Sequence, residues 1–319
     1  MKNVILLILK RTLASVVTVL VISLIIFIGV ELLPGDVAET VLGQSATAET
    51  VKAFRDELKL DLPPHTRYGV WLKDFVQGNF GNSLANGRPV SGLIGWRFAN
   101  TIFLAATTAL IAVPLAVVLG VLAAFYRNTL FDKSISVITL SFISFPEFFI
   151  AYILIVVFSV QLNMFPSMAA INASMSLGAK INAILLPALT LTFVVTAHMM
   201  RQTRAAIINV LSSAYVEMAE LKGIKRLRII LLHAFPNSLS PVINVIALNL
   251  AYLVVGVVIV EVVFVYPGLG QLLVDSVAKR DIPVVQASGL IFAAAYVFLN
   301  LLADVLSMLV NPRLRQLAS

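Results

Sequence analysis

Residues able to do covalent chemistry are few in this sequence and stand far apart. The 319 residues contain no cysteine, so a disulfide framework, a thiolate metal site and a cysteine nucleophile are all excluded. The three histidines, His65, His198 and His233, do not have the spacing of metal ligands. No phosphate-binding Gly-x-x-x-x-Gly-Lys-Ser/Thr loop, His-Glu-x-x-His motif or Gly-x-Ser-x-Gly motif occurs. We therefore predict a chain without a catalytic site, a metal site or an ATP site of its own.

Three carboxylates stand inside long apolar runs, where charged side chains usually face a cavity or a partner rather than lipid. Glu147 follows Pro146 and would lie about 20 Å into the third run if that run were one helix. Two interpretations of Glu147 stay open. It could contact a solute's ammonium group or a cation, or it could be a protonated or hydrogen-bonded structural carboxyl. Glu261 and Asp304 stand nearer the ends of their runs, which favours capping or interfacial roles.

The elements that must position these residues are membrane-spanning helices. Hydrophobic residues make up 60% of the chain and charged residues 12%, about half the charge of a soluble domain. Six runs approach or exceed the roughly 20 apolar residues that a spanning helix needs. They are too long for the alternating strands of a membrane barrel. We predict an all-α integral membrane protein with about six transmembrane helices. The runs are 12–30, 98–126, 134–160, 181–200, 242–260 and 282–303.

Two prolines suggest where two of the predicted helices begin. Pro187 falls early in the fourth run, and we expect it in the first helical turn, where its missing N–H is harmless. Pro241 stands directly before the fifth run. We therefore expect the fifth helix to begin after it.

The distribution of charge predicts the orientation. With a cytoplasmic N-terminus, the inside segments hold 13 Lys and Arg against three acids, and the outside segments hold ten of each sign. Cytoplasmic loops of membrane proteins carry such an excess of Lys and Arg. The net charge of +7 is therefore explained by topology and does not indicate nucleic-acid binding. Both termini of this multi-pass membrane protein are predicted to be cytoplasmic.

Two connections are too long to be simple turns. Residues 34–97 lie outside and alternate charged and apolar residues, which predicts a small helical subdomain at the outer mouth. Residues 201–241 lie inside and read as two short helices around Gly223, a residue favoured where a helix ends in a left-handed conformation. Ile224, Leu227, Ile230 and Leu231 give the second helix one apolar face. A helix lying on the inner leaflet and a helix docking onto a partner protein fit this pattern equally well.

The inner connection resembles the loop that marks binding-protein-dependent ABC import permeases. That loop has Glu-Ala-Ala, three residues, then Gly, and here Met replaces the first Ala. The residues that follow resemble the dipeptide, oligopeptide and nickel subfamily, whose loops read His-Ala-x-x-Asn followed by Pro. The resemblance assigns ATPase coupling to Glu217, Met218, Ala219, Gly223, His233, Pro236 and Asn237.

Four further stretches resemble the same subfamily in the same order along the chain. Together with the outer subdomain they resemble the first permease of a heterodimeric pair. They are Leu-Leu-Pro-Gly-Asp at 32–36, the outer segment 78–90, the connection 260–286 and Asn-Pro-Arg-Leu-Arg at 311–315. Within the connection, Pro267, Gly268 and Gly270 are identified by resemblance as a gate-like turn.

The resemblance implies the type I ABC importer permease fold. It implies a first helix within 1–33, a periplasmic subdomain at 34–97, a permease core at 98–310 with its coupling loop at 201–241, and a cytoplasmic tail at 311–319. It implies import of peptides or related small solutes, with ATP and Mg bound by two partner ATPases. The other implied partners are a paralogous permease and a periplasmic or lipid-anchored solute-binding protein. The alternative is a secondary transporter driven by an ion gradient, using intramembrane acids such as Glu147.

Overall fold

The computed structural model describes residues 2–32, 47–57 and 61–310, and this part of the chain is helical without any extended strand. The predicted all-α class is therefore confirmed. The helices are α1 (Lys2–Glu31), α3 (Ala48–Glu57), α4 (Pro64–Val76), α5 (Val90–Phe125), α6 (Leu130–Ser144), α7 (Glu147–Leu154), α8 (Leu177–Leu211), α9 (Ala214–Leu221), α10 (Arg226–Arg228), α11 (Phe235–Gly256), α12 (Val258–Val263), α13 (Leu269–Ala278) and α14 (Ile282–Val310).

Five helical stretches of the described chain are long and apolar enough to cross a membrane, and the bent pair α6 and α7 makes a sixth if it is one span. The predicted number of spans agrees with this. The helices run beyond the apolar runs, however, because helical hydrogen bonding does not stop where the apolar side chains stop. Helix α5 begins at Val90, eight residues before the predicted run, and α8 continues to Leu211.

The third predicted span is not one helix. Helix α6 ends at Ser144, Phe145 adopts an extended conformation with φ −89° and ψ 136°, and α7 begins after Pro146 at an angle of 102° to α6. Proline disfavours the helical conformation in the residue before it, which explains the break. The expectation that Glu147 lies deep in one straight helix is therefore wrong. Glu147 is the first residue of α7, directly after the break.

Both expectations about helix-starting prolines are also wrong. Helix α8 begins at Leu177, where Ser176 accepts a hydrogen bond from the Ala179 N–H at 3.3 Å, so Pro187 lies inside the helix. Helix α11 begins at Phe235 and contains Pro241. Spanning helices tolerate internal prolines because neighbouring helices and local adjustments satisfy the freed backbone groups.

Helix α8 is the centre of the bundle. Within its most apolar window 78% of the residues are buried, and its most extensive packing is against α5. The contact is close because α5 presents small residues. A Cβ on Gly120 would stand 2.8 Å from the Thr203 Cβ, and Ala116 and Ala123 are fully buried. Small residues allow this approach between spanning helices. Helix α1 lies at the periphery against α14.

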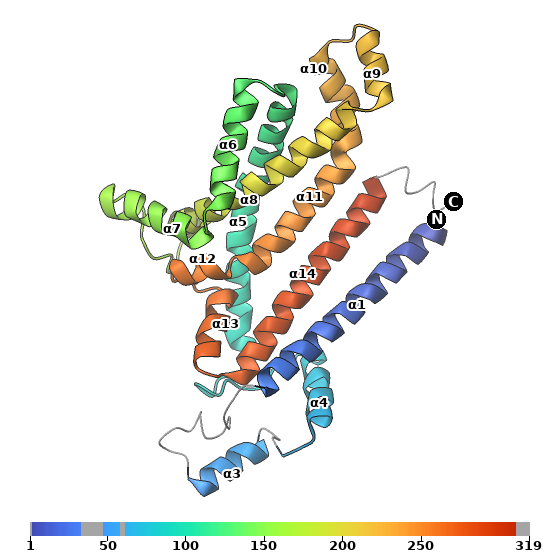
Figure 1. The fold of residues 1–319 in the computed structure, drawn as a ribbon. Helices are drawn as coiled ribbons and strands as arrows, with labels where there is room; N and C mark the ends of the chain where they lie inside the picture. The colour runs from blue at the N-terminus through green and yellow to red at the C-terminus, as the bar shows by residue number, and fades with distance from the viewer. Residues whose placement is uncertain (1, 33–46, 58–60, 311–319) are drawn as a thin grey trace.

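The connections gather at two opposite ends of the bundle (Figure 1). Helices α9 and α10 lie at the end where α1 begins and α14 ends, and α3 and α4 lie at the other end. Helix α4 is fastened to α1 there, because the rings of Phe27 and Tyr68 meet at 5.4 Å and the hydroxyls of Ser23 and Tyr68 are 2.8 Å apart. The start of α1, the turn between α5 and α6, and helices α9 and α10, which belong to the described part of the predicted basic inner segments, thus lie at one end of the molecule.

Candidate functional site

The candidate coupling segment, residues 213–224, is a short helix closed by a defined cap. Helix α9 ends at Leu221, two residues before Gly223. Gly223 has φ +73°, its N–H donates to the Glu220 carbonyl at 2.8 Å, and the Ile224 N–H donates to the Ala219 carbonyl at 3.2 Å. This pair of bonds is the Schellman motif, which needs a left-handed residue where Gly223 stands. The predicted conformation of Gly223 is therefore confirmed.

The side chains of α9 divide into a buried and an exposed set. Val216 and Ala219 pack against Ile229 from the start of the next helical stretch. The small Ala219 side chain therefore makes its close contact within this chain. Three apolar residues face outward instead, and Glu217 and Gly223 are exposed with them. We call these three residues the α9 stripe; they are Tyr215, Met218 (54% exposed) and Leu221 (76% exposed).

The second half of the inner connection does not form a separate short helix. Helix α10, the π-helical segment Ile229–Ala234 and α11 follow one another without a gap, so this half is continuous with the helix of the fifth span, which begins at Phe235. Of the predicted apolar face, Leu227 is exposed and Ile224 is half-buried. Pro236 and Asn237 are exposed in the first turn of α11. The side chains of His233, Ile230 and Leu231 lie outside the described residues.

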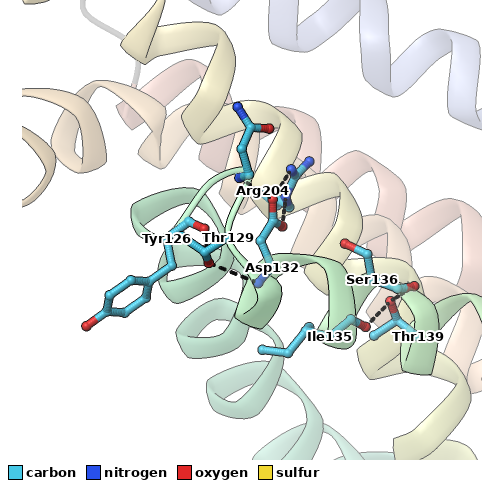
Figure 2. Close-up of polar contacts among 8 residues, drawn as sticks. Tyr126, Thr129, Asp132, Ile135, Ser136, Thr139 and Arg204 are labelled. Carbon is cyan, nitrogen blue, oxygen red and sulfur yellow. Dashed lines mark hydrogen bonds and ion pairs between the residues drawn. The ribbon is translucent and has the colours of Figure 1, made fainter.

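An ion pair that the sequence did not suggest fastens α6 to α8 near the coupling segment (Figure 2). The Arg204 guanidinium donates to both oxygens of Asp132, at 2.7 and 2.8 Å, and the Asp132 side chain is only 5% exposed. The same carboxylate accepts the Asn128 N–H at 3.0 Å, where the chain turns with φ +66°. Arg204 stands about 10 Å before the end of α8. The turn between α5 and α6 is thus held to the helix that leads into α9.

A second polar cluster lies at the turn 264–271, toward the opposite end of the bundle. Glu261 is fully buried, and its carboxylate accepts hydrogen bonds from the Thr101 hydroxyl at 2.6 Å and from two backbone N–H groups of α13. Those groups belong to Gly270, at 2.7 Å, and Gln271, at 3.1 Å. The Leu269 N–H donates to the Thr101 hydroxyl at 2.8 Å. A carboxylate at a helix N-terminus is favourable. The predicted capping role of Glu261 is confirmed.

The residues predicted as a gate-like turn close around that carboxylate. A Cβ on Gly268 would overlap the Glu261 carboxylate, and one on Gly270 would stand 2.8 Å from the Val258 Cα. Glycine is therefore required at both positions. The Asn100 amide donates to the Pro267 carbonyl at 2.8 Å, so the turn is also tied to α5. Sequence reasoning identified Pro267, Gly268 and Gly270 and missed their partners Asn100 and Thr101.

Glu147 and Tyr252 form a third polar contact, between α7 and α11. The Tyr252 hydroxyl donates to one carboxylate oxygen of Glu147. The other oxygen, Oε2, is buried and has no hydrogen-bond partner among the described residues. The pair stands where the third span is broken. The hydrogen bond from Tyr252 agrees with a structural role for one carboxylate oxygen of Glu147. The other oxygen has no partner in the described chain, so its role is not explained by this contact.

Comparison with known proteins identifies the class. The description "Binding-protein-dependent transport system inner membrane component" matches residues 116–316, and the description of the N-terminal part of such membrane components matches residues 4–109. The chain belongs to this family and is an ABC importer permease subunit, a multi-pass membrane protein. This assignment sets aside the gradient-driven secondary transporter.

Individual relatives cover almost the whole chain. The glutathione transport system permease protein GsiC of Escherichia coli strain K12 is 38% identical over 308 residues, which is 97% of this chain and 98% of the relative. The proteins of the same name from Shigella dysenteriae serotype 1 and Salmonella choleraesuis are 38% and 37% identical over the same length. These relatives are permease subunits and are not enzymes. The resemblance inferred from the motifs is therefore confirmed.

Proposed function

We propose that this chain forms half of the path by which peptides or related small solutes enter the cytoplasm. Its partners in this proposal are a paralogous permease, two ATPases that bind ATP and Mg, and a solute-binding protein outside the membrane. Family membership supports this division of labour, since the chain has no phosphate-binding loop. The relatives are named for the transport of glutathione, which is a tripeptide, and this supports a peptide-like solute.

The α9 stripe is the observation that carries the proposal. An exposed row of apolar side chains on a surface helix indicates contact with another molecule. The inner leaflet and a partner protein, the two alternatives left open for the second helix of this connection, are also the two candidates for the α9 stripe. Helix α9 contains Glu217 and Glu220 and has neither Lys nor Arg between its ends. A helix that lies on an anionic leaflet is basic. Its charge therefore favours a protein groove, which we assign to the partner ATPase.

The connections of α9 suit the transmission of movement. Only two residues separate it from α8, the central helix, and after Gly223 the chain continues within a few residues into α10 and α11. Val216 and Ala219 hold α9 against the start of this second helical stretch. A displacement of α9 by the ATPases would therefore be passed to α8 and α11. Packed helices shift in this way when transporters and other switching proteins change state.

Substitution of Gly223 tests the proposal in the assembled importer. Gly223→Trp forces a bulky residue into a left-handed conformation, which costs about 1–2 kcal/mol, and it places the ring beside the α9 stripe. We expect uptake to be lost while the protein stays in the membrane, and ATP hydrolysis to lose its dependence on the loaded binding protein. The measurements are uptake in whole cells and ATPase activity in proteoliposomes.

Gly87 provides a matched control. It also has positive φ (+68°), and open space surrounds its Cα, but it lies in the segment before α5 at the opposite end of the bundle. Gly87→Trp carries the same backbone strain without touching the α9 stripe, so uptake should remain coupled to ATP hydrolysis. If Gly223→Trp transports normally, or if both variants fail alike, the coupling role assigned to α9 is wrong.

A further inference from the structure

The break between α6 and α7 exposes a surface that is not uniformly apolar. Ser141 and Ser144 are exposed in the last turn of α6, and Glu147 follows directly after the break. The two serine hydroxyls donate to carbonyls of α6, at 3.0 and 2.8 Å, so Glu147 is the group at this break that lipid does not satisfy. Ionisable side chains in spanning segments usually face a partner or a water-filled path. Figure 1 shows α7 leaving the line of α6 beside α12. This surface is therefore a candidate lining of the solute path.

The chemistry of this surface suits one kind of ligand. Oε1 of Glu147 is held by the Tyr252 hydroxyl, which fixes the carboxylate, and Oε2 is left without a donor among the described residues. Leaving a buried carboxylate oxygen without a donor is costly, so a donor from outside this chain is favoured. The rings of Phe145 and Phe149, two residues before and two residues after Glu147 in the chain, are exposed and pair at 5.3 Å. Aromatic faces attract cations.

The chemistry of this surface suits a single positive group better than a metal ion. Divalent cations such as Ca²⁺ take six to eight oxygen ligands, mostly from several carboxylates and carbonyls. No group of three or more His, Cys, Asp or Glu residues in the described chain could hold a metal. One carboxylate, held at one oxygen by a phenol and without a donor at the other in the described chain, matches an ammonium group, which offers N–H donors and one charge.

We propose that Glu147, positioned by Tyr252, binds the ammonium group of the solute as it passes through the permease. This inference rests on the proposed import of peptides, since a peptide carries such a group. It selects the solute-contact interpretation of Glu147 over the purely structural one. The contact is a charge-assisted hydrogen bond made while the solute leaves water. Because it is a single contact, the solute can both enter and leave the site.

The absence of cysteine permits a direct test in the complete importer, reconstituted with its partner subunits. Phe148→Cys places a thiol on the exposed side of α7, and Leu248→Cys places one on α11, one turn before Tyr252. Each is treated with a cationic reagent, 2-(trimethylammonium)ethyl methanethiosulfonate, and with the anionic 2-sulfonatoethyl analogue. The rates are read from the adduct mass on this chain and divided by the rates with free 2-mercaptoethanol.

We expect the cationic reagent to be favoured about tenfold at both positions, because the carboxylate charge is close and only partly screened. In a Glu147→Gln background the preference should fall to about one. In a Tyr252→Phe background it should persist, because the charge remains. Leu130→Cys, exposed at the far end of α6, is the control whose reagent preference should not respond to Glu147→Gln.

Two results would overturn the proposal. If neither reagent reaches the thiols, lipid or the paralogous permease covers this surface. If the reagents react but Glu147→Gln leaves the preference unchanged, the carboxylate is already neutralised, by a proton or by a cation of the partner permease. The labelling requires no uptake. Its failure is therefore distinguishable from failure of the proposed import function, which the Gly223 variants test separately.

Discussion

The coupling segment and the turn 264–271 are two bends in one chain that are held in opposite ways. At the coupling segment, Val216, Ala219 and Ile229 form a small buried cluster, and the capping bonds come from the backbone of the segment itself. At the turn, Glu261 is completely enclosed, and hydrogen bonds reach it from a distant helix as well as from α13. Regions with few buried contacts open and shift at low free energy, whereas densely bonded regions do not.

This difference indicates a division of roles between the two ends of the bundle. The buried side of α9 is held by few contacts, and the outer side is left for a partner. The turn 264–271 has its polar groups satisfied internally, with the Tyr266 hydroxyl donating to the Asn100 carbonyl at 2.6 Å. We infer that the turn holds α13 in a fixed position, and that α9 is the element that the ATPases displace. The predictions below test this inference by disturbing each end separately.

The largest effect on stability is expected at the turn. Glu261→Ala leaves the Thr101 hydroxyl and two backbone N–H groups of α13 buried without an acceptor. Unsatisfied buried groups cost about 1–3 kcal/mol each, so we expect a loss of about 4 kcal/mol and a clearly lower Tm. Tm is measured by intrinsic fluorescence on the complex purified in detergent. Glu261→Gln, which keeps one acceptor oxygen, should lose less.

Glu217→Ala is the matched control at the other end. It removes an exposed glutamate from α9, and exposed substitutions usually change stability by no more than about 0.5 kcal/mol. Tm should therefore stay close to that of the unmodified complex. Equal Tm values for Glu261→Ala and Glu217→Ala would contradict the inference that the two ends of the bundle are held differently.

A smaller effect is expected at the ion pair between α6 and α8. Arg204→Met leaves the Asp132 carboxylate with its backbone donor but without a countercharge. Loss of one partner from a fully buried pair costs about 3–5 kcal/mol, and because 27% of the Arg204 side chain is exposed we expect about 2 kcal/mol. Uptake should fall together with Tm, since the pair holds the helix that leads into α9.

The double variant Asp132→Leu with Arg204→Met separates charge burial from positioning. Removing both charges should restore most of the lost stability, because no carboxylate is then left uncompensated. If the ion pair also positions α8 for coupling, uptake should stay low although Tm recovers. Recovery of both would show that the pair serves stability alone.

The sequence predicted those features that depend on local composition. Apolar run length placed the six spans, and the helix formers before Gly223 placed α9 and its left-handed cap. The break at Phe145 also has a local cause, the following proline, although the long apolar run concealed it. In contrast, Asp132 and Arg204 are 72 residues apart in the chain, and Thr101 and Glu261 are 160 apart. Nothing near either residue in sequence indicates its partner, because the pairing arises only when the helices pack.

The same limit applies to the faces of α9. Its sequence has apolar residues at six of eight positions, and helical spacing alone does not determine which of them face the chain and which a partner. Contact with Ile229, a residue of the following helical stretch, decides that Val216 and Ala219 are inside. The α9 stripe was therefore visible only in the structure. Its exposed residues are the natural target for the mildest substitution.

Met218→Ser should have the smallest effect on the stability of this chain. It should nevertheless weaken the assembly of the chain with the ATPases selectively. Met218 is more than half exposed, so the free energy of unfolding should change by no more than about 0.5 kcal/mol. Burying such a side chain against a partner stabilises the contact by about 1.5 kcal/mol, which is roughly tenfold in affinity. Binding of the ATPases to membranes that contain the variant should weaken by that factor. It is measured by adding increasing amounts of the ATPases and sedimenting the membranes with the bound protein. Val76→Ser removes an even more exposed apolar side chain at the end of α4, at the opposite end of the bundle, and should leave ATPase binding unchanged. If the two variants bind the ATPases equally well, the α9 stripe is not the contact, and the inference that α9 is the moved part loses its basis.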